Sequence, residues 1–348
     1  MFEELLRDWD GEEAVIRYDA ESGAWMFVCV HSTALGPAGG GTRMRVYASP
    51  GDGLADAMRL SAAMTRKMAI AGIARGGGKA VLAVPKLPEG EARRRLLLRY
   101  GRLVTSLGGT YHTAGDMNIT PADLDVVAET CPWVFGSNAH GGNSGYGTAR
   151  GVLHGIHASV EHIFGSPDLD GRSVLVQGVG SVGRDLAGYL AEAGARVLVA
   201  DVDEFAAKRV AKEVGGEVVP ARDALSADCD VYAPCAVGGT LGAATIPTLG
   251  CRIVAGSANN QLVEPEDAER LHAAAILYAP DYVINAGGVL QLIGTEELGL
   301  DPDALEESYV RIGETLRRLY DDADATGVTP AVAAERLALQ LVAAAPPR

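Results

Sequence analysis

The fold is decided by residues 173–183, which read Ser-Val-Leu-Val-Gln-Gly-Val-Gly-Ser-Val-Gly. An apolar run typical of a buried strand leads into three glycines, and an amphipathic helical pattern follows them. In such a unit Gly178 permits a tight turn, Gly180 lets the backbone approach a pyrophosphate, and Gly183 allows close helix packing. The N-terminus of the helix then faces the phosphates. The predicted dinucleotide contacts are Gly178, Gly180, Ser181, Val182 and Gly183.

A carboxylate follows at the end of the next apolar run. Asp201 stands 18 residues after Gly183, directly behind residues 196–200. A carboxylate there accepts hydrogen bonds from a ribose 2′-hydroxyl and repels a 2′-phosphate, so the predicted cofactor is NAD rather than NADP. Asp203 adds a second negative charge nearby. Later apolar runs, spaced widely enough for crossover connections, indicate a doubly wound parallel sheet; they are 230–233, 252–255 and 276–278.

The first half of the chain also predicts an α/β domain. Residues 25–30 and 80–84 read as strands, and residues 54–71 and 91–107 read as amphipathic helices. Thr120, followed by proline and then an acid, is a helix start.

The two halves meet in a glycine-rich stretch near residue 140. We expect an N-terminal α/β catalytic and substrate domain at 1–139 and a Rossmann domain at 140–319, with a cleft between them. The last helical residues, about 320–348, are free to pack back on the first domain.

Composition excludes several classes of protein. The 348 residues are 48% hydrophobic and 22% charged, which is the balance of a globular protein. A net charge of −15 argues against a nucleic-acid partner, and no apolar run approaches the roughly 18 residues that cross a bilayer. The five cysteines are odd in number and scattered, which disfavours disulfides and zinc. We therefore expect a cytoplasmic protein without a membrane partner.

Three charged residues of the first half are candidates for chemistry. Lys67 ends a helical pattern, and Lys79 follows three glycines that would let a substrate lie against the chain. Two ammonium groups near one site disfavour each other's charge, so one could act as a base. The alternative is that both lysines are solvated. Asp116 follows a β-like run and could emerge at a strand end.

Two other groups of charged residues have ordinary explanations. His154, His157 and Glu161 share a helix face, but an amphipathic helix accounts for them and we predict no metal. The basic run of Arg93–Arg95 with Arg99 predicts a solvated helix face.

Several further segments occur in a fixed order along the chain. They are Leu35–Arg43 (LGPAGGGTR), Lys67, Gly76–Lys79 (GGGK), Gly115 and Asp116, Ala233–Ala236 (APCA), Ala258–Leu262 (ANNQL) and Tyr278–Gly288 (YAPDYVINAGG). With the glycine loop they make the chain resemble the glutamate, leucine, phenylalanine and valine dehydrogenases. These enzymes oxidatively deaminate amino acids with a nicotinamide cofactor.

The resemblance implies a role for each matching residue. Lys67 would pair with the substrate α-carboxylate, Lys79 would act as a base that activates water against an iminium intermediate, and Asp116 would move protons at the amino nitrogen. The remaining contacts implied are Gly40 and Asn260 for the amino acid, and Thr148, Ala236 and Asn285 for the cofactor. The products would be a 2-oxo acid and ammonia, and the family is usually homo-oligomeric.

Substrate choice follows from the implied pocket, which is uncharged: Gly39, Ala114, Val289 and Leu292. The absence of a lysine there disfavours glutamate, and the chain length fits the short branch that acts on apolar amino acids. Gly39 leaves room for a ring, which favours an aromatic substrate over leucine and valine. One segment departs from the family: residues 143–147 read Asn-Ser-Gly-Tyr-Gly in place of a proline turn, which predicts a looser turn near Thr148.

Two alternatives stay open at this point. One is a Rossmann oxidoreductase acting on a hydroxy acid, which would need no base like Lys79. The other is a non-catalytic NAD-binding sensor, against which the presence of Lys67, Lys79 and Asp116 argues.

Overall fold

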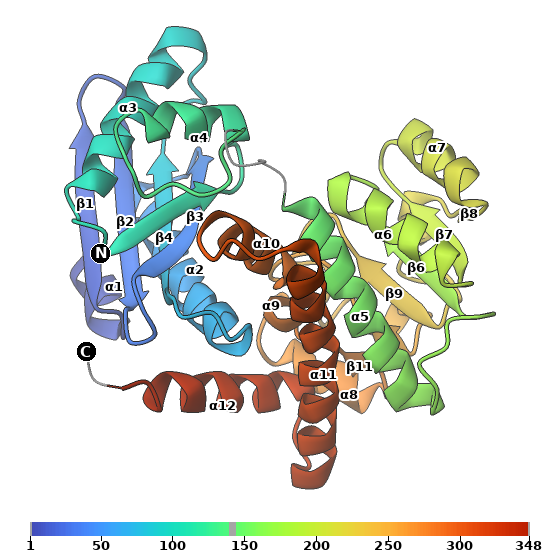
Figure 1. The fold of residues 1–348 in the computed structure, drawn as a ribbon. Coiled ribbons are helices and arrows are strands. Elements are labelled where there is room, and N and C mark those ends of the chain that lie inside the picture. Colours follow the sequence, from blue (N-terminus) through green and yellow to red (C-terminus); the bar gives the residue numbers. More distant parts are fainter. Residues whose placement is uncertain (1, 139–143, 347–348) are drawn as a thin grey trace. The chain divides into compact units, whose positions relative to one another are not determined.

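The computed structural model describes residues 2–138 and 144–346 (Figure 1). The chain divides into two compact units, one of residues 1–143 with 338–348 and the other of residues 144–337. The boundary expected at 139/140 lies outside the described residues. Each unit is described by itself.

The first unit is built on a five-stranded mixed sheet in the order β1-β2-β4-β3-β5. Its strands are β1 (Glu13–Asp19), β2 (Ala24–Ser32), β3 (Ala38–Arg45), β4 (Gly76–Ala83) and β5 (Tyr111–Gly115). Strands β3, β4 and β5 run parallel, whereas β2 is antiparallel to both β1 and β4. The helices are α1 (Phe2–Asp8), α2 (Pro50–Ile70), α3 (Gly90–Thr105) and α4 (Pro121–Ala128). Figure 1 shows how they surround the sheet.

Alternation along the strands separates the two faces of this sheet. Phe27 and Val81 point to one face, where they pack with Leu54 of α2. Leu82 points to the other face and packs with Leu96 of α3 in a larger cluster that also includes residues of α4. Because strand side chains alternate, Lys79 lies on the same face as Val81. That face is the one covered by α2.

The structure corrects the expectation that the three glycines before Lys79 leave room for a substrate. Gly76–Gly78 are the first residues of β4, and they pair in register with β2 and β3. A Cβ on Gly77 would lie 2.1 Å from the backbone nitrogen of Thr65, and one on Gly78 would lie 2.6 Å from the Tyr111 ring. The glycines are therefore required by packing inside the unit. The other glycine-rich strand, β3, is missing from the elements predicted above, because a run of glycines reads as a loop.

The arginine run of α3 is likewise not a simple solvated face. Arg93 makes two hydrogen bonds of 2.7 Å to Asp123, and Arg99 lies 2.7 Å from Asp19. These carboxylates belong to α4 and β1, which are distant in sequence. The run therefore links three elements through ion pairs.

The second unit is the predicted doubly wound domain. Its described strands form a six-stranded sheet in the order β11-β10-β9-β6-β7-β8, and every pair is parallel. The strands are β6 (Ser173–Gln177), β7 (Arg196–Ala200), β8 (Glu217–Val218), β9 (Val231–Pro234), β10 (Ile253–Val254) and β11 (Leu277–Tyr278). Numbered within the unit this is the 6-5-4-1-2-3 order of a Rossmann fold, which confirms the predicted fold class.

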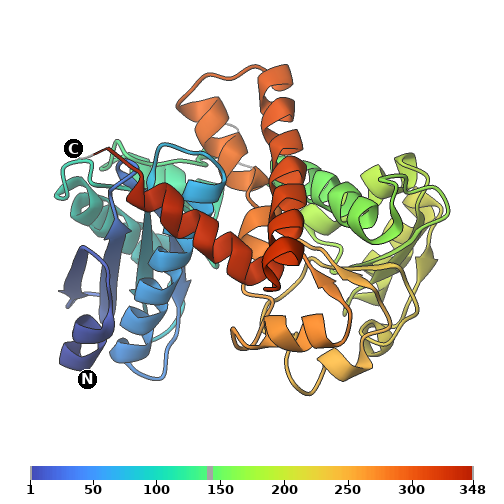
Figure 2. The same ribbon diagram turned by 90° about the horizontal axis from the view of Figure 1, so that it is seen from below.

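Helices flank this second sheet or pack on one another beside it (Figures 1 and 2). They are α5 (Gly145–Phe164), α6 (Ser181–Glu192), α7 (Glu204–Val214), α8 (Asp267–Ala273), α9 (Asp281–Ile284), α10 (Gly287–Glu296) and α11 (Pro302–Thr326). Helix α11 packs along α5, where Tyr320 and Ser159 share a buried hydrogen bond of 2.7 Å. Helix α12 (Pro330–Ala343) begins in the second unit and ends in residues assigned to the first.

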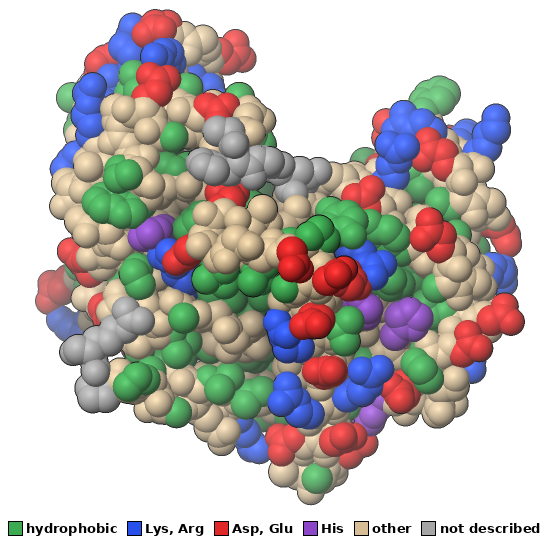
Figure 3. Space-filling model, viewed as in Figure 1, with side chains coloured by type: hydrophobic (Ala, Val, Ile, Leu, Met, Phe, Trp, Pro, Cys, Tyr) green, Lys and Arg blue, Asp and Glu red, His purple; other side chains and the backbone are tan. Residues whose placement is uncertain are grey.

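The surface carries both signs of charge. On the face shown in Figure 3, acidic and basic side chains are interspersed. Among the described residues, no helix is both long and apolar enough to span a bilayer. All five cysteines are free, and four of them are buried.

Candidate functional site

Three charged side chains meet on one face of the first unit's sheet. Lys79 comes from β4, Arg43 from β3, and Asp116 follows the last residue of β5. Lys79 Nζ forms an ion pair with Asp116 Oδ2, and Arg43 Nη2 lies 3.5 Å from the same oxygen. The register pairs Thr42 of β3 with Ala80 of β4 and with Gly115 of β5, which brings these three residues together although they are far apart in sequence.

The turn after β5 fixes the orientation of Asp116. The amide of Met117 donates to Asp116 Oδ1 at 2.5 Å, and the amide of Ile119 donates to the carbonyl of Asp116 at 2.9 Å. Asn118 has a φ of 59° and donates from Nδ2 to the carbonyl of Met44 in β3. The left-handed conformation is one that asparagine tolerates better than most residues. The carboxylate is therefore held from its own turn as well as by the cations.

The cluster is largely removed from water. The side chain of Lys79 is 8% exposed, that of Asp116 21% and that of Arg43 13%. Burial alone raises the pKa of Asp116, but the charges of Lys79 and Arg43 outweigh it and hold the pKa at about 2. Asp116 is therefore ionised at neutral pH.

The other predicted residues of the first unit lie on or beside the same strands. Lys67 is half-buried in the last turn of α2, the helix that covers the Lys79 face. Gly39 pairs with His112 and faces Met68 of α2, whose Cε would lie 3.2 Å from a Cβ on Gly39. Ala114 is half-buried in β5.

Gly40 is enclosed by the neighbouring strands of the sheet. A Cβ on Gly40 would lie 1.8 Å from the carbonyl oxygen of Gly78. The carbonyl of Gly40 already accepts a 2.6 Å hydrogen bond from the Tyr111 hydroxyl. Its glycine identity is thus explained by packing within the sheet.

In the second unit the glycine loop has the predicted form. Gly178 has a φ of 94°, where a side chain is strained, and a Cβ on it would meet Ala236 at 2.6 Å. A Cβ on Gly183 would lie 1.9 Å from the carbonyl of Gly178, so this glycine allows the helix to pack on the turn. Gly180 is exposed and has nothing within 4 Å of its Cβ position. The first turn of α6, with Ser181 and Val182, therefore opens onto free space.

Asp201 follows β7 beside this loop. Its Oδ2 accepts a 2.8 Å hydrogen bond from the amide of Val179, and its Oδ1 accepts one of 2.9 Å from the amide of Asp203. A carboxylate has about four acceptor positions, so two remain for a ribose hydroxyl. Asp203 instead caps α7 by accepting from the amides of Phe205 and Ala206. The predicted second negative charge, that of Asp203, therefore interacts with the N-terminus of α7.

A network of amide side chains lies beyond β10. Asn285 is 6% exposed and donates from Nδ2 to the carbonyl of Ser257 and to Asn259 Oδ1. Its own Oδ1 is buried, and no described residue bonds to it. Asn260 has a φ of 51°, and its backbone N–H donates to the carboxylate of Asp281.

Asp281 therefore positions Asn260, a role that the sequence analysis missed. It lies within the quoted segment Tyr278–Gly288, but its position in the chain carries no sign of a contact with a residue 21 positions earlier. Arg43 was missed in the same way, inside the segment Leu35–Arg43.

Residues 145–147, for which the sequence predicted a loose turn, belong to helix α5 in the structure. Ser144 precedes this helix, and a Cβ on Gly147 would lie 2.6 Å from the carbonyl of Gly287 in α10. A Cβ on Gly288 would lie 2.6 Å from the Thr148 hydroxyl, which donates to the carbonyl of Ser144. The glycines allow two helices to cross closely. Asn143 lies outside the described residues.

Val289 and Leu292 follow this crossing in α10. They are three positions apart and therefore share one face of the helix, and both are half-buried. Ala236, after β9, is exposed beside Gly178.

The three residues weighed as metal ligands have separate partners. His154 Nε2 lies 2.8 Å from Glu306, His157 Nδ1 lies 2.7 Å from the carbonyl of Pro167, and Glu161 binds Arg317. Across residues 2–138 and 144–346, no three His, Cys, Asp or Glu side chains gather as a metal site.

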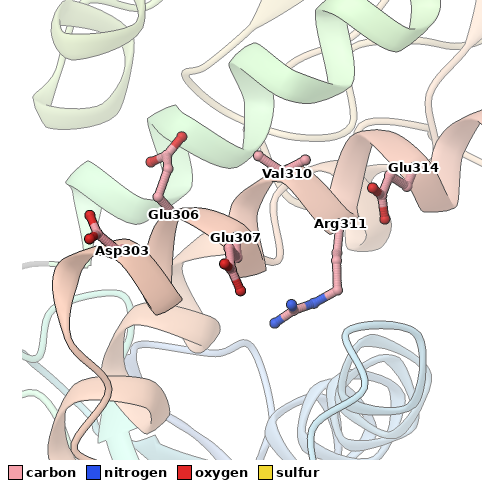
Figure 4. A pocket seen from close by; sticks show the side chains of 6 residues that line it. All are labelled: Asp303, Glu306, Glu307, Val310, Arg311 and Glu314. Atoms are coloured by element: carbon pink, nitrogen blue, oxygen red, sulfur yellow. The ribbon is translucent and has the colours of Figure 1, made fainter.

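A surface hollow along α11 contains none of the predicted site residues (Figure 4). One helix supplies its whole lining, and four of the six side chains are acidic: Asp303, Glu306, Glu307, Val310, Arg311 and Glu314. Glu306 is already paired with Arg150 and His154. We therefore do not assign the substrate or cofactor site to this hollow.

A Rossmann sheet with an open glycine loop, together with a buried lysine–aspartate pair, defines a two-domain dinucleotide-dependent dehydrogenase. Family models match both parts: residues 18–136 match the Glu/Leu/Phe/Val dehydrogenase dimerisation domain, and residues 199–296 match Glutamate/Leucine/Phenylalanine/Valine dehydrogenase. The chain belongs to the Glu/Leu/Phe/Val dehydrogenase family. Enzymes of this family are generally NAD(P)-dependent.

Individual relatives match almost the whole chain. The chain is 43% identical over 343 residues to a valine dehydrogenase of Streptomyces coelicolor, covering 97% of this chain and 93% of that one. It is 39% identical to a leucine dehydrogenase of Geobacillus stearothermophilus, covering 96% and 91%. The crystal structure of L-tryptophan dehydrogenase from Nostoc punctiforme matches with a TM-score of 0.85, 38% identity and coverage of 99% and 98%. The predicted amino-acid dehydrogenase is thereby confirmed.

Proposed function

We propose that this enzyme oxidatively deaminates an apolar L-amino acid with NAD, giving a 2-oxo acid and ammonia. The observation that carries the proposal is the buried contact of Lys79 with Asp116, because a paired base and acid are what hydrolysis of an iminium requires. An oxidoreductase acting on a hydroxy acid would need no base to activate water.

The three charged residues implied by the family resemblance each have a step in this proposal. Lys67 binds the substrate carboxylate through its ammonium group. Lys79 takes a proton from water as the water adds to the iminium carbon, and Asp116 carries protons to and from the amino nitrogen. When ammonia leaves, the carbon that lost a hydride has become the carbonyl carbon of the 2-oxo acid.

The residues of the second unit fit a nicotinamide dinucleotide. The free space over Gly180 suits a pyrophosphate, and the two remaining acceptor positions of Asp201 suit a ribose diol. The buried Oδ1 of Asn285 is an acceptor of the kind that a carboxamide needs. When bound, the cofactor supplies the hydride acceptor. Asp201 supports NAD over NADP because its charge would repel a 2′-phosphate.

The substrate side chain is apolar in this proposal. Ala114, Val289 and Leu292 carry no charge that would pair with a second carboxylate. The relatives are named for valine, leucine and tryptophan, and each of those substrates is apolar. The place of Gly39 beside the flexible end of Met68 supports the larger, aromatic side chains, because a thioether can move to admit a ring.

Assembly and location complete the proposal. Residues 18–136 match the family's dimerisation domain, which supports a homo-oligomer. The five free cysteines support a reducing compartment, for which we propose the cytoplasm.

A substrate panel tests the function. The purified enzyme is mixed with NAD and with L-valine, L-leucine, L-phenylalanine, L-tryptophan or L-glutamate, and NADH and ammonia are both measured. We expect equal amounts of the two products from an apolar amino acid and little of either from glutamate. NADH without ammonia, or turnover of glutamate alone, would contradict the proposal, and so would binding of NAD without turnover.

A further inference from the structure

Arg43 is the one cation of the charged cluster to which the steps above give no task. Its Nη1 donates to Asp56 Oδ2 of α2 at 2.9 Å, and its Nη2 lies 3.5 Å from Asp116 Oδ2. That Asp116 oxygen is also the partner of Lys79. The guanidinium therefore bridges two carboxylates, one in the covering helix and one in the reaction site.

Asp56 fixes the far end of this bridge. It accepts a 2.7 Å hydrogen bond from the Tyr47 hydroxyl and another of 2.7 Å from Arg59. Burial raises the pKa of Asp56, but these bonds and the charge of Arg43 outweigh it and lower the pKa. Asp56 is therefore ionised at neutral pH and is held from three sides. An arginine anchored on it has little freedom to leave Asp116.

The proposed reaction makes Arg43 necessary at one stage. While Lys79 carries its proton, Asp116 has two cations beside it. Once Lys79 becomes an amine, Arg43 is the cation that remains on this largely buried carboxylate. Without a cation, a buried carboxylate takes up a proton, and Asp116 could then no longer accept one from the substrate nitrogen.

We propose that Arg43 is a positioning residue of the reaction: anchored on Asp56, it keeps Asp116 an oriented carboxylate while Lys79 gains and loses its proton. The inference rests on the function proposed above. It extends that function to a residue that never touches the reacting atoms.

The sign of the pH effect follows from the groups that face the pair. Asp116 meets Lys79 from β4, Arg43 from β3 and the Met117 amide from its own turn, while Asp56 faces Arg43 from α2. Removing the fixed charge of Arg43 makes the Lys79–Asp116 pair bind its proton more tightly. The protonated, inactive form then persists to higher pH.

The test is the pH dependence of kcat/KM for Arg43→Gln. We expect the acid limb of the profile to move to higher pH by about one unit, with kcat at its optimum at least about tenfold lower. Arg45→Gln is the matched control, because Arg45 is an exposed arginine two positions along the same strand that makes no ion pair with Asp56 or Asp116 among the described residues. Its acid limb should stay at the wild-type position.

Arg43→Lys separates charge from geometry. It keeps the positive charge but lacks the fork that reaches two carboxylates, so the acid limb should stay near the wild-type position while kcat falls. Thermal melting and NAD binding by fluorescence are measured for all variants. If Arg43→Gln does not fold, full kcat in Arg43→Lys still overturns the inference.

The remaining outcomes are also decisive. If Arg43→Gln loses kcat equally at every pH, Arg43 only supports the fold and the inference is wrong. Wild-type enzyme that oxidises no amino acid defeats the proposed function instead. Active wild-type enzyme with an unmoved limb in Arg43→Gln defeats this inference alone.

Discussion

Two glycine-rich segments look alike in the sequence and use glycine for opposite reasons. In Gly76–Gly78 every missing Cβ makes room for the protein itself, since each would lie within 2.6 Å of an atom of the first unit. In the loop of residues 178–183 the end glycines also relieve internal contacts, but Gly180 has nothing within 4 Å. The first segment lets Lys79 stand in a buried strand, and the second leaves backbone open to a ligand.

The difference shows which kinds of groups each unit provides for the reaction. The first unit gathers side chains from three strands and a helix into a charged cluster with little water. The second unit presents backbone amides and a single carboxylate at the end of a parallel sheet. Changes in one unit should therefore affect proton transfer, and changes in the other should affect cofactor binding.

Lys79→Ala should show the largest effect. It removes the proton acceptor for water and leaves Asp116 beside Arg43, so kcat should fall by about 10²–10⁴-fold, or roughly 3–5 kcal/mol. NAD affinity, measured by fluorescence titration, should be unchanged. Lys67→Ala is the control, and it should act mainly by raising KM for the amino acid. Near-normal turnover in Lys79→Ala would show that the base lies elsewhere.

Gly78→Ala and Gly180→Ala test the two uses of glycine directly. The new methyl group of Gly78→Ala would press on the fully buried Tyr111 ring, so the free energy of unfolding should fall by about 1–3 kcal/mol. Denaturant unfolding measures this change.

The same methyl group at Gly180 meets open space. Gly180→Ala should keep the free energy of unfolding within about 0.5 kcal/mol while raising the Kd for NAD about tenfold. Equal losses of stability in the two variants would remove the distinction between the segments.

Asp201 should govern the choice of cofactor. Wild-type enzyme should prefer NAD to NADP by at least about tenfold in kcat/KM, which is about 1.4 kcal/mol. Asp201→Asn keeps one acceptor oxygen, for the Val179 amide, but loses the one for the Asp203 amide and removes the charge, so this ratio should shrink. Steady-state kinetics with both cofactors measures it, and an unchanged ratio would place the discrimination on another residue.

Gly39→Leu should have the smallest effect, on substrate choice. The added side chain would meet Met68 and fill space beside β3, so activity should fall more for phenylalanine than for valine. The measurement is the ratio of kcat/KM for the two substrates. Equal losses would remove Gly39 from the specificity argument.

Much of the fold could be predicted because its signals are local. The apolar runs at 173–177, 196–200 and 230–233 are separated by turns and helical patterns. This order is typical of a parallel, doubly wound sheet, and the structure confirms it. Strand β3 escaped prediction because Ala38–Gly41 carry almost no side-chain pattern. Its strand identity comes from pairing with β4 and β5, which are distant in sequence.

The sequence by itself determined which groups are present: Lys67, Lys79, Asp116, the glycine loop and Asp201. It could do so because these residues lie in short segments whose order is characteristic of the family. Only the tertiary structure decided that Lys79 is buried in a strand, that Asp116 shares its oxygen with Arg43, and that Asp56 anchors this arginine. These contacts join residues 13 to 73 positions apart, and they depend on the pairing of β3 with β4 and β5 and on the packing of α2 on the sheet, not on any local pattern.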